Sequence, residues 1–203
     1  QTDGGESAFT VDMLAKAVKC KKLSGEKNTE IKNLTNDSRR VVKGAAFFAV
    51  SGANTDGNLY IEEAAHRGAV AIISERPAPG KYFPCAWIEV ENISMAMAMA
   101  SKAFYENPDE HLDIFAVTGT NGKTSVTWLV QHILNDMQEK CGLIGTIQYD
   151  LGGRCLPAAR TTPQALETYA MLHQMRRAKS KAAAIEISSH AIAQKRVEGL
   201  AID

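Results

Sequence analysis

The feature that most constrains the fold is a glycine-rich string set between two apolar segments. Residues 118–124 read TGTNGKT; they follow a short apolar run at 114–117 and precede a segment that we expect to be helical from about 122 to 137. In this position backbone N–H groups and the positive end of the helix dipole point at a bound phosphate. Lys123 would reach the β- and γ-phosphates of a nucleotide, and Thr124 would offer its hydroxyl to Mg²⁺. The string therefore predicts a phosphate-binding loop.

This loop departs from the general phosphate-loop spacing, because Val117 stands where the first glycine is expected. The alternative interpretation is a glycine-rich turn that carries a surface lysine. The flanking strand and helix, together with the lysine and threonine at the end of the string, favour the phosphate loop.

Strand and helix patterns alternate after the loop. We expect a strand at 141–147, a helix from Thr162 and Pro163, as N-cap and first helical residue, to about 177, and a strand at 182–187. The alternation predicts a parallel, doubly wound sheet with helices on both faces. Three such strands would leave edges unpaired, and residues 199–203 resemble the start of another strand, so we expect the natural protein to continue.

The first half of the chain has its own α/β pattern. Thr10 can cap a helix that ends near residue 20, Gly68 can end a helix at 58–67, and Ser94 can cap a helix that runs to about 106. Apolar strands are expected at 45–50, 69–74 and 86–90. The break at 107–110 predicts two domains, 1–108 and 109–203, with a partial sheet in the second.

The strand expected at 182–187 carries a carboxylate, Glu186, near its C-terminal end. Ligands of doubly wound sheets bind at the carboxyl ends of the strands, so Glu186 could face the same crevice as Lys123. A buried carboxylate needs a partner, which Mg²⁺ would supply. The alternative is an ion pair between Glu186 and a nearby Lys or Arg.

Three other polar positions have open interpretations. His190 could orient a substrate or merely stabilise a turn, and we assign it no catalytic role. Thr161 and Thr162 read first as helix-capping residues, although either hydroxyl could also touch a ligand. The string Asp37-Ser38-Arg39 by itself predicts a turn with a solvated ion pair.

Composition excludes several classes of protein. Lys plus Arg equals Asp plus Glu at 23 each, so there is no overall basic excess for nucleic acid or anionic lipid. The four cysteines form no CxxC pair and the five histidines no HExxH, which argues against a zinc or redox motif and fits a reducing cytoplasm. The longest apolar stretch is too short to span a bilayer, and the first residues do not resemble a signal peptide.

Several ordered motifs together resemble the Mur ligase family, in particular its members that make UDP-N-acetylmuramoyl-tripeptide. In the second half these are TGTNGKTS, ARTTP and EISSHAIAQKR; in the first they are DSRRV, FFAVSG, TDG and GAVAII. The resemblance runs from about residue 34 to 196. It implies an N-terminal uridine-nucleotide-binding α/β domain followed by part of a phosphate-loop ATPase domain with a doubly wound parallel sheet.

The resemblance also implies roles for individual residues. Lys123 and Glu186 would be catalytic, and Thr124 and Glu186 would hold Mg²⁺. The ATP-binding residues would be Gly119, Thr120, Asn121, Gly122, Lys123, Thr124 and Ser125. The UDP end of the substrate would meet Asn36, Ser38, Ala53, Asn54 and Thr55, with Ala53 contributing only its backbone. The muramoyl-peptide end would meet Arg160, a variable position, and Thr161, Thr162, Ser188, Gln194 and Arg196.

The implied reaction is ATP-dependent activation of a carboxylate as an acyl phosphate, followed by attack of an amino acid amine. The third amino acid added to UDP-N-acetylmuramoyl-L-alanyl-D-glutamate would be meso-diaminopimelate or L-lysine. We expect a cytoplasmic monomer that acts on small molecules and meets neither nucleic acid nor membrane; these 203 residues alone should not ligate. The alternatives are a ligase like folylpolyglutamate synthetase, which shares the TGTNGK loop, and a non-catalytic module that binds a nucleotide or UDP-sugar.

Overall fold

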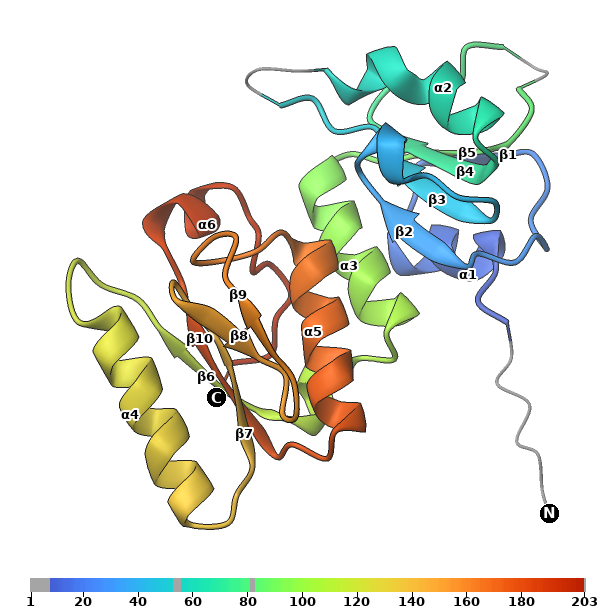
Figure 1. The fold of residues 1–203 in the computed structure, drawn as a ribbon. Coiled ribbons are helices and arrows are strands. Elements are labelled where there is room, and N and C mark those ends of the chain that lie inside the picture. The colour runs from blue at the N-terminus through green and yellow to red at the C-terminus, as the bar shows by residue number, and fades with distance from the viewer. Residues whose placement is uncertain (1–7, 53–55, 81–82, 203) are drawn as a thin grey trace, which may run out of the picture. The chain divides into compact units, whose positions relative to one another are not determined.

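Two five-stranded sheets organise the computed structural model, which describes residues 8–52, 56–80 and 83–202 (Figure 1). Each sheet belongs to one of two units, Gln1–Ala100 and Ser101–Asp203, and the boundary between the units falls within one helix, α3 (Ile93–Phe104). Each unit is described by itself below.

The first unit is a mainly parallel sheet with the strand order β1-β5-β4-β3-β2. Strands β2 to β5 pair in parallel, and the edge strand β1 pairs with β5 in the antiparallel sense. Their bounds are β1 (Lys22–Ser24), β2 (Asn33–Thr35), β3 (Ala45–Phe48), β4 (Ala69–Ser74) and β5 (Ala86–Glu89). The three expected strands are therefore confirmed, whereas the three-residue strands β1 and β2 were not predicted.

A helix of the first unit covers one face of this sheet. Alternate side chains of β3, among them Phe47, pack with Ile61 and Ala64 of α2 (Ile61–His66), which Figure 1 shows over one face. Helix α1 (Val11–Ala17) begins at Thr10, whose hydroxyl accepts a hydrogen bond from the backbone of Met13, as predicted. A short 3-10 helix, η2 (Gly57–Tyr60), occupies the first turn of the helix expected at 58–67.

The predicted cap of α3 is wrong by two residues. The helix begins at Ile93, and the side chain of Asn92, rather than that of Ser94, accepts a hydrogen bond from the backbone N–H of Met95 at 2.9 Å. Asn is as good a cap as Ser, and the buried Ile93 extends the apolar face of the helix to its first residue.

The second unit has the sheet order β6-β10-β7-β8-β9. Strands β6 (Asp113–Val117), β10 (Ala182–Glu186) and β7 (Cys141–Ile144) are parallel, which confirms the expected parallel sheet. An antiparallel hairpin of two three-residue strands, β8 (Gln148–Asp150) and β9 (Cys155–Pro157), extends the sheet beyond β7. The hairpin was not predicted.

Two helices cover opposite faces of this sheet, as a doubly wound fold requires. Val130 and Leu134 of α4 (Lys123–Asp136) pack on Cys141, Leu143, Ala182 and Ala184. On the other face Met175 of α5 (Ala165–Arg177) lies so close to Gly142 that any β-carbon there would stand 2.4 Å from its sulfur. The fold class predicted from the sequence is confirmed.

Two expected details of the second unit are wrong. Helix α5 is capped by Gln164, which forms a capping box with Glu167, so Thr162 and Pro163 precede the helix. Residues 200–202 form no strand; the backbone N–H of Ala201 instead donates to the buried carboxylate of Asp109 at 2.9 Å. Among the described residues, no helix is both long and apolar enough to cross a membrane.

Candidate nucleotide and substrate site

The glycine-rich loop joins β6 to α4 as predicted. Gly119 and Gly122 have φ angles of +145° and +79°, a backbone region that favours glycine, and Gly122 is the N-cap of α4. The first N–H groups of this 14-residue helix therefore face the loop, where an anion can accept from them. The ammonium group of Lys123 donates to the carbonyl oxygen of Gly119 at 2.8 Å, which holds it over the loop. Thr120 and Asn121 are exposed on the same loop, and Ser125 is exposed in the first turn of α4.

Glu186 lies at the carboxyl end of β10 and is fully buried. Its carboxylate accepts three hydrogen bonds: from the Thr124 hydroxyl at 3.0 Å, the Thr146 backbone N–H at 3.0 Å and the Thr146 hydroxyl at 2.9 Å. None of the ion pairs found in the described part of the chain includes Glu186, so the alternative of a Lys or Arg partner is not realised. The bond from Thr124 places Glu186 beside the phosphate loop.

Gly145 makes room for this carboxylate. It follows β7, and a β-carbon at this position would stand 2.4 Å from Oε1 of Glu186. Neither Gly145 nor Thr146 was predicted as a site residue. The available signal was the position of both near the C-terminal end of the strand expected at 141–147, since ligands of doubly wound sheets bind at the carboxyl ends of the strands.

The oxygen atoms gathered here fit a magnesium ion bound together with a nucleotide. Mg²⁺ is usually held by one or two carboxylates, water and the phosphates of the substrate. Glu186 supplies one carboxylate, and the Thr124 hydroxyl donates its proton to Glu186, so its lone pairs stay available. Within the described residues no three His, Cys, Asp or Glu side chains gather as a metal site, so phosphates would have to complete the coordination shell.

The residues expected near the muramoyl-peptide meet on the other side of Glu186. The Thr162 hydroxyl donates to the backbone oxygen of Glu186 at 2.7 Å and accepts from the backbone N–H of Ser188 at 3.0 Å. Arg196 donates to the backbone oxygen of Thr162 at 2.9 Å and to the side-chain oxygen of Gln194 at 3.0 Å. Thr162 is therefore a bridge between two loops rather than a helix cap, and it joins Ser188, Gln194 and Arg196 into one group.

The remaining predicted residues of this group lie at its margin. The Thr161 hydroxyl is 3.1 Å from that of Thr146, and the backbone of Arg160 bonds to the Tyr149 hydroxyl while its side chain is exposed. Partial burial, with Arg160 nearby, lowers the pKa of Arg196 from its ordinary value. His190 is exposed in the short helix α6 (Ser189–Ala193).

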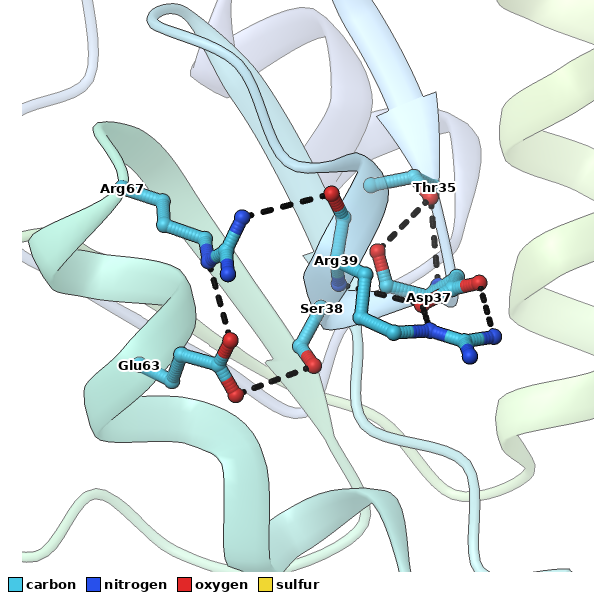
Figure 2. A network of polar contacts seen from close by, with 6 residues as sticks. All are labelled: Thr35, Asp37, Ser38, Arg39, Glu63 and Arg67. Atoms are coloured by element: carbon cyan, nitrogen blue, oxygen red, sulfur yellow. Dashed lines mark hydrogen bonds and ion pairs between the residues drawn. The ribbon is translucent and has the colours of Figure 1, made fainter.

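In the first unit, a polar network surrounds Ser38 at the carboxyl end of β2 (Figure 2). Asp37 caps the short 3-10 helix η1 (Ser38–Arg40), and its carboxylate accepts from the Arg39 guanidinium at 2.9 and 2.8 Å. These bonds hold the pKa of Asp37 below its ordinary value, and the exposed Arg39 confirms the predicted solvated pair. Asn36 is exposed beside them. Ala53, Asn54 and Thr55 lie outside the described residues.

A second network in this unit is centred on Asp56. Its carboxylate accepts from the Asn58 side chain at 2.7 Å, from the Ser51 hydroxyl at 2.9 Å and from Arg76 at 2.6 Å. Ser74, at the end of β4, donates to the Asn58 side-chain oxygen at 2.8 Å. The pKa of Asp56 is lowered from 3.8 to about 2. The largest cause is the hydrogen bond from the Asn58 side chain, followed by the bond from the Asn58 backbone N–H, and Ser51 and Arg76 contribute less.

We expect Asn58→Ala to raise the pKa of Asp56 toward 3.8, because it removes the largest cause of the shift. Since folding lowers this pKa, the hydrogen bonds of the carboxylate stabilise the fold fully above pH 3.8 and are lost as the pH falls through about 2. An NMR titration of the Asp56 carboxyl carbon measures the midpoint. Asn28→Ala, at an exposed asparagine of the same unit, is the control, and an unchanged midpoint in Asn58→Ala would contradict the assignment.

Comparison with known proteins identifies the class that this fold and site define. Residues 30–105 match the family model described as "Mur ligase family, catalytic domain", and residues 117–203 match the "Mur ligase middle domain". The chain belongs to the Mur ligase family, which confirms the resemblance found in its motifs.

Two similar relatives and one solved structure carry the same name within this family. The chain is 42% identical over 172 residues to the UDP-N-acetylmuramoyl-L-alanyl-D-glutamate–2,6-diaminopimelate ligase of Solibacter usitatus, covering 85% of this chain and 35% of the relative. It is 40% identical over 182 residues to the ligase of the same name from Oceanobacillus iheyensis, covering 89% and 37%. A solved structure of a ligase of this name superposes with a TM-score of 0.68 at 27% identity, covering 86% of this chain and 35% of that one. The chain thus spans about a third of the length of these relatives.

Proposed function

We propose that these residues are part of an ATP-dependent ligase that adds diaminopimelate to UDP-N-acetylmuramoyl-L-alanyl-D-glutamate. The observation that carries the proposal is the hydrogen bond between Thr124 and the buried Glu186, which joins a phosphate loop to an acidic strand end. The names of the relatives support the substrate, and they favour diaminopimelate over lysine as the third residue.

The first chemical step would be attack of the D-glutamate carboxylate on the γ-phosphorus of ATP. The chain's task is to hold the triphosphate and to offset charge that builds up as ADP leaves. The N–H groups at the start of α4 and the loop residues Gly119 to Ser125 would bind the phosphates, and Lys123 would exchange its bond to Gly119 for one to them. A magnesium ion held by Thr124 and Glu186 would neutralise phosphate charge.

The second step would be attack of the amino acid amine on the acyl phosphate, with loss of phosphate. The muramoyl-peptide would be held by Arg160, Thr161, Thr162, Ser188, Gln194 and Arg196. The positive charge of Arg196 would offset the negative charge that develops in this step. Asn36, Ser38 and residues 53–55 would bind the UDP end. We assign these two tasks to domains 109–203 and 1–108, and segments outside the 203 residues would bind the incoming amino acid.

Calorimetric titration of the chain with MgATP, with UDP and with UDP-N-acetylmuramoyl-L-alanyl-D-glutamate tests the proposal. We expect Arg196→Ala to weaken binding of the muramoyl-peptide substrate by roughly 10- to 100-fold, because a hydrogen bond to a charged group contributes about 1.5 to 3 kcal/mol. UDP and MgATP should bind as before. Arg177→Ala, at an exposed arginine in the last turn of α5, is the matched control.

Two outcomes would contradict the proposal. A ligase of the folylpolyglutamate type would bind MgATP and ignore both uridine ligands. A module that senses only a nucleotide would bind one nucleotide with no further gain from the muramoyl-peptide and no effect of Arg196→Ala.

A further inference from the structure

The hydroxyl group of Ser38 donates its proton to a hydrogen bond within the protein. Ser38 is the first residue of η1 and only 8% exposed, and its Oγ lies 3.2 Å from Oε2 of Glu63 on α2 (Figure 2). An ionised carboxylate can only accept hydrogen bonds, so the Ser38 hydroxyl must be the donor in this contact. The lone pairs of Oγ are then all that the Ser38 hydroxyl can offer to another group.

Glu63 is held in the orientation that this contact needs. Arg67, one turn later on α2, donates from Nε to Oε1 of Glu63 at 2.9 Å and from Nη1 to the backbone oxygen of Arg39 at 3.3 Å. Arg67 thus occupies one carboxylate oxygen and leaves the other facing Ser38, as Figure 2 shows. Glu63 is thus the acceptor in both contacts, and Arg67 and Ser38 are the donors.

This direction restricts what Ser38 can meet on a uridine nucleotide; the argument rests on the proposed function, which assigns Ser38 to the UDP end. The diphosphate only accepts hydrogen bonds, so it cannot pair with the lone pairs of the Ser38 hydroxyl. The ribose hydroxyls can donate or accept, so they impose no choice. The N3–H group of uracil is a fixed donor, whereas N3 of cytosine is an acceptor.

We infer that Glu63 is a positioning residue that makes Ser38 an acceptor for the N3–H of uracil, so that the site selects uridine over cytidine nucleotides. Cytosine would place an acceptor lone pair against the lone pairs of Ser38 with no proton between them. Two acceptors that face each other without a hydrogen bond lower the affinity strongly, so the site can reject a ligand of nearly identical shape.

The substitution Glu63→Gln tests this inference, because it keeps the shape of the side chain and changes only the direction of the bond. Arg67 still requires an oxygen at the Oε1 position, so the amide nitrogen would stand at the Oε2 position and donate to Ser38. The Ser38 proton is then free to turn toward the ligand. We expect the unmodified chain to bind UDP at least about tenfold more tightly than CDP, and Glu63→Gln to bring this ratio close to one; a tenfold change corresponds to about 1.4 kcal/mol.

Calorimetric titration with UDP and with CDP gives the ratio for each variant. Glu62→Gln, at an exposed glutamate on the same helix, is the matched control and should keep the original ratio. If Glu63→Gln does not fold, Glu63→Ala carries the same expectation, because it also releases the Ser38 proton.

The outcomes separate this inference from the proposed function. If Ser38→Ala weakens UDP binding while both Glu63 variants keep the original UDP to CDP ratio, the role of Glu63 is wrong and the uridine site stands. If Ser38→Ala leaves UDP binding unchanged, the assignment of Ser38 to the UDP end fails, and the inference fails with it.

Discussion

Replacing Lys123 with alanine is expected to weaken MgATP binding roughly 10- to 100-fold and to leave the melting temperature nearly unchanged. Within the described residues, the ammonium group bonds to the Gly119 carbonyl oxygen alone, at an exposed loop, so it contributes little to the fold. Against a triphosphate it is a preorganised charge, and a hydrogen bond to a charged group contributes about 1.5 to 3 kcal/mol, which is a factor of roughly 10 to 100 in affinity. Calorimetric titration with MgATP and thermal unfolding measure the two effects.

Lys140 is a matched control for this substitution. Its ammonium group also donates to a backbone carbonyl oxygen, that of Ala178, at 2.8 Å, and it too belongs to the second unit, away from the phosphate loop. Lys140→Ala should leave MgATP binding intact. MgATP binding retained in Lys123→Ala would show that the loop is a turn with a surface lysine.

Gly145→Ala is expected to disrupt the acidic half of the site without touching any charged residue. The added methyl group would stand 2.4 Å from Oε1 of Glu186, and three hydrogen bonds hold that carboxylate in place. Overpacking of this kind costs about 1 to 3 kcal/mol of stability. Because the carboxylate must move away from Thr124, we also expect a higher Mg²⁺ concentration to be needed for nucleotide binding.

Gly153→Ala is the matched control, since in the described part of the chain no atom beyond its two chain neighbours lies within 4 Å of a β-carbon at that position. Thermal unfolding and the Mg²⁺ dependence of ATP binding should separate the two variants clearly. Glu186→Gln provides a second test, because its amide nitrogen would face hydroxyl and N–H donors while one anionic oxygen is lost. If Gly145→Ala and Glu186→Gln both bind MgATP with the original Mg²⁺ dependence, Glu186 is a structural residue.

The sequence predicted the parts of the site that depend on local pattern. The phosphate loop needs glycines at fixed positions between a strand and a helix, and Glu186 ends an apolar run, so both could be located from neighbouring residues alone. Gly145 and Thr146 could not, because their role depends on the register that sets β7 beside β10 in the sheet. Their place near the end of an expected strand pointed only to the edge of the sheet, whereas the register that brings them to Glu186 is a tertiary property.

Thr162 shows why capping rules gave a wrong assignment. A Thr before a Pro is a common start of a helix, and the helix does begin three residues later. Instead of capping the helix, its hydroxyl donates to the backbone oxygen of Glu186 and accepts from the backbone N–H of Ser188, at the end of the neighbouring strand. The short strands β1, β2, β8 and β9 escaped prediction because three residues are too few to show alternation.

The Thr162 bridge also has a thermodynamic consequence. One hydroxyl bonds the backbone on which Glu186 is mounted, and the carbonyl group of the same residue receives Arg196. A shift of either neighbour is therefore transmitted through a single residue to the other. If the nucleotide is held on one side and the muramoyl-peptide on the other, their affinities are coupled, and reciprocity requires that each ligand alter the binding of the other by the same factor.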